Sequence, residues 1–301
     1  MFQLNRNLIN KYNGTIHIFL LILVLVILFL YLGNGGEDGE SKSRSTSSLK
    51  EWINDESSQV EQDDERLVQF VRKNHIFQAN KLPYRFDNGD DTGNPSAGQL
   101  QSILPLLRKD PGGFYVEAGA NDGEWGANTL YLERHLGWNG LLVEASPATF
   151  EKLIRKNRKA FHSNAALSTK PRPMIATFYE NPTASIWGGL TYRFYHKNDH
   201  AVKVQCVPLY TLLLAINRTT VDFLSLDLEG SELDVLRTIP FDKVNIKSVA
   251  VEVINGKEGP EPVKELMSKN GYHLHETVGD LGDLIFINEE LFQLKNKKGS
   301  Q

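Results

Sequence analysis

The sequence predicts an α/β fold in which a mostly parallel sheet is covered by helices on both faces. Short apolar segments alternate with amphipathic segments from about residue 96 onward. Two of the short segments end in an acid that lies close to small residues, as the ligand-binding ends of parallel strands do. A long apolar run near the N-terminus predicts a membrane anchor ahead of this domain.

The charge balance, the cysteine count and the histidine spacing limit the classes of protein to which the chain can belong. The 301 residues include 33 basic and 37 acidic side chains, a balance that does not indicate a nucleic-acid partner. Cys206 is the single cysteine, so the domain has to be stabilised by a hydrophobic core rather than by internal disulfides. A buried thiol is favoured for Cys206, with an intermolecular disulfide as the alternative. His196 and His200 have no third ligand beside them, and we predict no metal site.

The apolar run IHIFLLILVLVILFLYL, residues 16–32, predicts a transmembrane signal-anchor helix. It contains no charged residue and has about the minimum length of a membrane span. Arg6 and Lys11 precede it and acidic residues follow it closely, so the positive-inside rule places residues 1–15 in the cytosol and the main domain in the lumen. A cleaved signal peptide is the alternative, because small residues follow the run.

The regions after the anchor differ in composition. Residues 33–65 are rich in Gly, Ser and acids and predict a disordered stalk. Residues 66–95 are a lead-in, in which Leu67, Val68, Phe70 and Val71 predict a short helix. The main domain spans residues 96–290, and residues 291–301 are a polar tail.

Apolar spacing and short apolar runs predict the elements of the main domain in order. Leu100, Ile103, Leu104 and Leu107 share one helical face, and the run Phe114–Glu117 is a short strand that ends in an acid. Further helices are predicted at 128–136, 148–157, 232–238 and 261–269, and further strands at 141–144, 222–227, 248–253 and 284–288. The stretch Trp187-Gly188-Gly189 is predicted to be ordinary loop packing, with part of a pocket wall as the alternative.

Two strand ends carry the chemical signal. Gly119, just after the first predicted strand, allows a tight turn and close approach to a ligand, and Glu117 can accept hydrogen bonds from an ammonium group. Glu144 ends the next strand and can hold both hydroxyls of a ribose. The loop lacks the G-x-G-x-x-G phosphate fingerprint, so we expect a nucleoside without a pyrophosphate, as in S-adenosylmethionine.

The stretch FYVEAGANDGEWGANTLYLERHLGWNGLLVEASPATFEKLIRKNRKAF and the later FLSLDLEGSELDVLRTIP resemble the FkbM-type methyltransferase family. The resemblance covers residues 96–290 and is closest to Star and Star-like single-pass membrane proteins. It implies a Rossmann-like class I methyltransferase sheet with S-adenosylmethionine as the cofactor. It also implies roles for the residues at the strand ends. The cofactor-binding residues it implies are Glu117, Gly119, Asn121 and Gly123 at the methionine end, Glu144 at the ribose, and Ala165, in a predicted third strand at 164–167, near the adenine.

Asp227 and Glu229 fall at the end of the fourth predicted strand, where the resemblance implies that substrate and methyl group meet. Transfer to a sugar-type hydroxyl needs a general base, and Asp227, Glu229 and Glu252 are the candidates by position.

Structural roles compete with these assignments. Gly119 and Gly123 could make a tight turn in a fold that has lost its ligand. Glu144, Asp227 and Glu229 could cap the helices that follow them.

Two functions follow from different classes. The first is an enzyme that transfers a methyl group from S-adenosylmethionine to a hydroxyl-bearing acceptor. The second is a non-catalytic Star-like luminal protein that binds membrane-bound growth-factor precursors as cargo in vesicle transport. The resemblance places that transport between the endoplasmic reticulum, the Golgi and late endosomes, with the plasma membrane as a further location. The anchor and the limited access of a luminal domain to a charged cytosolic cofactor favour the second, and the retained acids and glycines favour the first.

Overall fold

The computed structural model describes residues 51, 53, 55, 59–87, 98–107, 112–180, 188–190, 200–280 and 282–298. All features discussed below lie in the unit Ile53–Gln301. The predicted membrane span at 16–32 lies outside the described residues, as does most of the predicted stalk. Within the described part of the chain, none of the helices has the length and apolar character of a membrane span.

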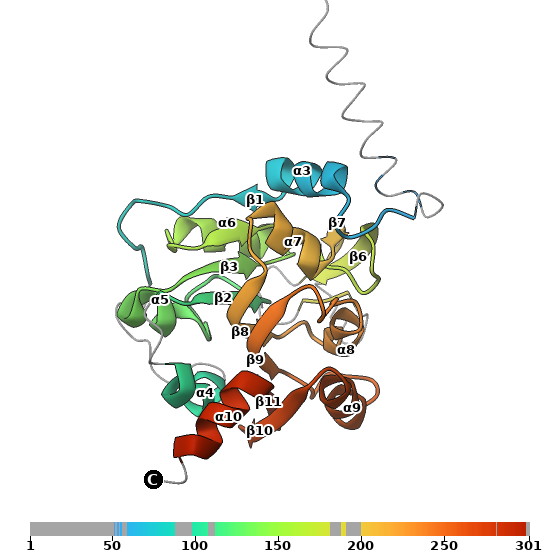
Figure 1. The fold of residues 1–301 in the computed structure, drawn as a ribbon. Coiled ribbons are helices and arrows are strands. Elements are labelled where there is room, and N and C mark those ends of the chain that lie inside the picture. Colours follow the sequence, from blue (N-terminus) through green and yellow to red (C-terminus); the bar gives the residue numbers. More distant parts are fainter. Residues whose placement is uncertain are drawn as a thin grey trace, which may run out of the picture. The chain divides into compact units, whose positions relative to one another are not determined.

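An eight-stranded sheet with the order β1-β4-β3-β2-β8-β9-β11-β10 forms the centre of this unit (Figure 1). The five central strands from β4 to β9 are parallel, whereas β1, β11 and β10 each run antiparallel to their inner neighbour. The bounds are β1 Ile76–Phe77, β2 Phe114–Ala118, β3 Asn139–Val143, β4 Phe161–Ser163, β8 Thr220–Leu226, β9 Asn245–Val251, β10 Tyr272–Val278 and β11 Asp283–Asn288. The predicted, mostly parallel sheet is confirmed.

The order of the strands reverses beside β2. The chain continues from β2 to β3 and β4 on one side, and β8 and β9 lie on the other. Such a reversal leaves a crevice beyond the carboxyl ends of the strands, because the loops on the two sides diverge. The residues that follow β2, β3, β4 and β8 therefore surround one place.

Helices cover both faces of the sheet. Tyr115, Leu142 and Phe223 pack on one face in a core cluster with side chains of α4, α5, α6 and α10. Figure 1 shows α4 and α10 next to each other, and the two helices are in contact. Val116 and Leu224, which point to the other face, are also fully buried. The helices are α3 Glu65–Asn74, α4 Gln99–Leu107, α5 Leu130–Leu136, α6 Pro147–Arg155, α7 Leu209–Ala215, α8 Glu232–Leu236, α9 Glu261–Lys269 and α10 Glu289–Lys298.

Local sequence explains where several helices begin and end. The hydroxyl of Ser146 accepts a hydrogen bond from the Thr149 N–H at 3.2 Å, and Pro147 occupies the first turn of α6. Gly137, with φ of +66°, ends α5 in the left-handed conformation typical of a helix C-terminus. The lead-in contains the predicted helix as α3. The final helix, α10, extends into the region read from the sequence as a polar tail, and its Leu291 belongs to the core.

A second sheet, with the order β5-β7-β6, lies between β4 and β8 in the sequence. Its strands are β5 Ala166–Leu167, β6 Met174–Glu180 and β7 His200–Val207. Phe178 and Cys206 pack in its small core, and Cys206 is buried as predicted. The predicted third strand at 164–167 was placed too late. The main-sheet strand β4 ends at Ser163. Its central residue, His162, is polar yet buried, so the strand does not show up as an apolar run in the sequence.

Candidate functional site

The loops after β2 and β8 touch each other at Gly119. The Asp227 N–H donates a hydrogen bond to the Ala118 carbonyl at 3.1 Å. Gly119 has φ of +85°, and a Cβ there would lie 1.9 Å from the carbonyl oxygen of Asp227. Only glycine therefore fits this position, because any side chain would push the two strand ends apart.

Glu144 follows β3, and its carboxylate is buried at the same end of the sheet. One oxygen accepts a hydrogen bond from the Asn121 N–H at 3.0 Å, and the other accepts one from the Ser146 N–H at 2.8 Å. Burial raises the pKa of Glu144 to about 7, despite these two hydrogen bonds. Ser146, and not Glu144, caps α6 with its side chain. Glu144 instead connects the loops after β2 and β3 through its two hydrogen bonds.

A group of acids follows β8 and β9. Asp227 and Glu252 are hydrogen-bonded to each other, and burial raises the pKa of both. The charge of Asp227 raises the pKa of Glu252 further, which favours a proton shared by the two carboxyl groups. Glu229, with φ of +56°, accepts a hydrogen bond from the Asn255 side chain at 2.6 Å.

Glu232, the first residue of α8, holds the loop that precedes the helix. Its carboxylate accepts hydrogen bonds from the N–H groups of Leu228 at 2.7 Å and Gly230 at 3.1 Å. Burial raises its pKa to about 7. Glu232 thus fixes the loop between β8 and α8, while Asp227 pairs with Glu252 and not with the start of the helix.

Two acidic groups have oxygens close enough together to hold a cation. In the first, carboxylate oxygens of Asp227, Glu232 and Glu252 lie within 4.8 Å of one another, in the arrangement that hard divalent cations accept. The second group surrounds the ammonium of Lys156, which lies 2.6 Å from Asp87 and 3.4 Å from Asp122 and also contacts Glu124. Because Lys156 already neutralises the second group, the first is the better candidate.

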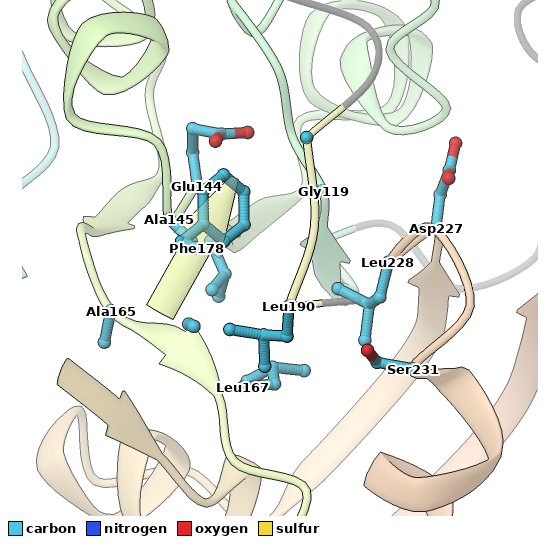
Figure 2. A pocket seen from close by; sticks show the side chains of 13 residues that line it. Gly119, Glu144, Ala145, Ala165, Leu167, Phe178, Leu190, Asp227, Leu228 and Ser231 are labelled. Atoms are coloured by element: carbon cyan, nitrogen blue, oxygen red, sulfur yellow. The ribbon is translucent and has the colours of Figure 1, made fainter. Parts of the chain in front are cut away.

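A pocket of about 420 Å³ opens at the point where the strand order reverses. Figure 2 shows Gly119 between Glu144 and Asp227, with Leu190 and Ser231 near the pocket. The second sheet contributes an apolar wall. The complete lining consists of Gly119, Val143, Glu144, Ala145, Ala165, Ala166, Leu167, Phe178, Gly188, Leu190, Asp227, Leu228 and Ser231.

The structure brings three of the six predicted cofactor residues together at this pocket, namely Gly119, Glu144 and Ala165. Asn121 adjoins it through the hydrogen bond to Glu144, and its own side-chain oxygen is buried without a hydrogen-bond partner among the described residues. Of the two predicted catalytic residues, Asp227 lines the pocket and Glu229 follows two positions later, beside Gly189.

Glu117 and Gly123 lie behind the pocket and support its loop. Glu117 accepts hydrogen bonds from the Asn128 N–H at 2.7 Å and from the Thr129 hydroxyl. A Cβ at Gly123 would lie 2.3 Å from the Leu153 side chain, so the absent side chain lets the loop pack onto α6. Both residues therefore support the loop after β2 rather than line the pocket.

Arg158 completes this support from the turn before β4. It is fully buried and donates to the Glu133 carboxylate at 3.0 Å, to the Thr129 hydroxyl at 3.1 Å and to the Gly123 carbonyl. A buried guanidinium with this number of partners holds several backbone segments in one arrangement. The sequence contains no spacing that would identify it.

Phe178, Leu190 and Ser231 are pocket residues that the sequence did not identify. Phe178 and Leu190 come from the second sheet and the segment beside it, whose fold the apolar pattern did not predict. Gly188 lines the pocket too, so for this residue the alternative of a pocket wall holds and the favoured loop packing was wrong.

The strand order and the pocket at its reversal define a Rossmann-like α/β protein of the kind that binds a ligand at the carboxyl ends of its strands. Residues 117–274, more than half of the chain, match the Methyltransferase FkbM domain. The chain belongs to this family, which confirms the family resemblance found in the sequence.

Three solved structures are similar to the chain at low identity. A methyltransferase from Pyrococcus furiosus is 16% identical, with a TM-score of 0.33, over 62% of this chain and 82% of that chain. A TehB-like SAM-dependent methyltransferase from Corynebacterium glutamicum is 13% identical, with a TM-score of 0.36, over 67% and 93%. Methyltransferase FkbM from Methylobacillus flagellatus is 12% identical, with a TM-score of 0.37, over 82% and 59%. No curated protein matches the chain, so the family assignment rests on the domain match.

Proposed function

We propose that the chain binds S-adenosylmethionine in the pocket at the strand reversal and transfers its methyl group to an acceptor oxygen. The observation that carries this proposal is the convergence of Gly119, Glu144, Ala165 and Asp227, from four different strand ends, on one pocket. Membership of the FkbM methyltransferase family supports the same reaction class.

The residues present fit such a cofactor. Glu144 can accept hydrogen bonds from two ribose hydroxyls, since each carboxylate oxygen has a lone pair beyond its backbone hydrogen bond. The apolar wall that includes Leu167, Phe178 and Leu190 suits a planar base. The missing side chain of Gly119 lets the loops after β2 and β8 close around the ligand.

The acids Asp227 and Glu252, which follow β8 and β9, can take part in proton transfer. When bound, the cofactor supplies a methyl group on a cationic sulfur. Asp227 lines the pocket and shares a proton with Glu252, so the pair can accept the proton that an acceptor hydroxyl loses. Burial keeps this region poorly solvated, which strengthens the attraction between the acids and a cationic group.

Calorimetric titration of the full chain with S-adenosylmethionine tests the proposal. We expect saturable binding by the wild type, loss of binding in Glu144→Ala, and unchanged binding in Glu151→Ala, whose side chain is exposed on the nearby α6. A folded wild-type protein that binds no cofactor would rule out the enzyme. Binding that survives Glu144→Ala would contradict the assignment of the ribose to Glu144.

A second candidate function is that of a membrane-anchored luminal protein that binds growth-factor precursors without catalysis, as in Star-like proteins. The uncharged apolar run at 16–32 and the polar segment after it favour this candidate. Protease treatment of sealed microsomes containing the full chain tests the topology. We expect the domain to resist digestion until detergent is added, and digestion in sealed vesicles would contradict a luminal location. Cofactor binding in the titration above would separate the enzyme from the cargo-binding protein.

A further inference from the structure

The hydroxyl of Ser231 is buried but has no hydrogen-bond partner among the described residues. The residue is 2% exposed, and it lies just before α8. A serine at this position usually caps the helix with its side chain, yet Ser231 makes no such bond. The neighbouring Glu232 accepts the N–H groups of Leu228 and Gly230, which lie before the helix, and no described residue binds the Ser231 hydroxyl.

This hydroxyl belongs to the apolar side of the pocket. Leu167, Leu190 and Leu228 line the pocket together with Ser231. Figure 2 shows the Ser231 oxygen near Leu228 and directed toward the side on which Leu190 lies. A buried hydroxyl without a partner costs free energy, since it has lost its hydrogen bonds to water. A ligand that hydrogen-bonds to it would remove this cost.

We propose that Ser231 hydrogen-bonds to the edge of the planar base of a nucleoside held in this pocket. The inference rests on the proposed function, because Glu144 then holds the ribose and the base occupies the apolar side. Phe178 and the leucines contact the faces of the base, whereas its nitrogen-rich edge needs a polar partner. A serine hydroxyl both donates and accepts, so it suits either kind of nitrogen on that edge.

The proposal predicts that Ser231→Ala has opposite effects on stability and on binding. Without ligand, the variant should melt no lower than the wild type, because the substitution removes an unpaired buried hydroxyl. Its Kd for S-adenosylhomocysteine should rise about fivefold, the effect of one neutral hydrogen bond.

The matched control is Ser248→Ala. Ser248 is also fully buried, but its hydroxyl donates to the Asp222 carbonyl at 2.6 Å, and neither residue lines the pocket. This variant should melt lower than the wild type and bind S-adenosylhomocysteine with unchanged affinity.

The experiment measures the melting temperature and the calorimetric Kd of the full chain and the two variants. The ligands are S-adenosylhomocysteine and 5′-methylthioadenosine, which has the same base and ribose but no amino-acid group. An equal loss of affinity for both ligands in Ser231→Ala supports contact with the adenosine part that they share, whose base the apolar side of the pocket holds. A loss for S-adenosylhomocysteine alone, no loss for either ligand, or a lower melting temperature without ligand overturns the proposal. A folded wild type that binds neither ligand overturns the proposed function and this inference with it.

Discussion

Three glycines in the loop after β2 have positive φ but different surroundings. A Cβ at Gly119 would meet the backbone of Asp227, and one at Gly123 would meet the side chain of Leu153. A Cβ at Gly126 would meet no atom within 4 Å. The first glycine thus brings two strand ends together and the second packs the loop onto α6, whereas a side chain at the third would meet strain from the positive φ alone.

Gly119→Ala should destabilise the protein by about 3 to 5 kcal/mol, since backbone strain and overpacking add. Gly126→Ala should cost only about 1 to 2 kcal/mol, the strain of a left-handed alanine. Urea denaturation of the two variants measures this difference. Equal losses would show that the contact between the loops after β2 and β8 contributes little.

Residues at strand ends were predictable, because the carboxyl ends of parallel strands meet at one place whatever the details of packing. Glu144 and Asp227 follow this rule. Ser231 does not, because it is distinguished by a buried hydroxyl without a hydrogen-bond partner among the described residues. The presence or absence of such a partner depends on three-dimensional geometry and leaves no trace in residue spacing.

At the scale of elements, the loop after β2 and the start of α5 are held by a buried network around Arg158. Glu133 on α5 pairs with its guanidinium, and Glu117 on β2 binds the Thr129 hydroxyl, to which Arg158 also donates. The network connects a strand, a helix and the pocket loop. It gives the loop a fixed shape before any ligand arrives, which reduces the entropy lost on binding.

Arg158→Met should therefore destabilise the protein by about 3 to 5 kcal/mol, because Glu133 is left buried and unpaired. Arg155→Met is the matched control, since the ion pair of Arg155 with Glu151 is exposed on α6. That variant should lose less than about 1 kcal/mol. Denaturation curves give both values, and similar losses would contradict the role assigned to the network.

The main sheet was predicted from short apolar runs, whereas the second sheet was not predicted. Strand β6 carries side chains that are mostly half-buried, and its apolar residues fall on both faces. Strand β7 alternates Val202, Val204 and Cys206 with Lys203 and Gln205, a strand signal that the prediction overlooked. The pocket wall was therefore missed, although the opposite side of the same pocket was predicted.

At the scale of the whole molecule, several buried acids cluster around the pocket. Burial raises the pKa of Glu144 and Glu232 to about 7 and that of Glu229 to about 8, from an ordinary value of 4.5. The folded protein therefore keeps protons that the unfolded chain has already lost at neutral pH. Stability must then fall as pH rises through the raised values.

We expect the free energy of unfolding to decrease from about pH 4.5, where the unfolded chain loses these protons, to about pH 8, where the folded protein has lost them too, by a few kcal/mol in order of magnitude. Between about pH 4 and pH 6.5 His162 opposes part of this decrease, because burial lowers its pKa to about 4 and the unfolded chain binds its proton first. Thermal unfolding across the pH range measures the slope. Glu229→Gln should flatten it, while Glu261→Gln, an exposed control, should not. If Glu229→Gln leaves the slope of stability against pH unchanged, the protons that the folded protein retains belong to other groups.

The short strand β1 has a practical consequence for any shortened version of the protein. Residues 76 and 77 pair with β4, and they precede both the matched domain and the domain start that the sequence suggested. A protein that begins at residue 96 would leave β4 as a bare sheet edge, with unpaired N–H and C=O groups open to another chain. Such a fragment would be prone to aggregation, whereas one that begins before α3 would keep that edge covered.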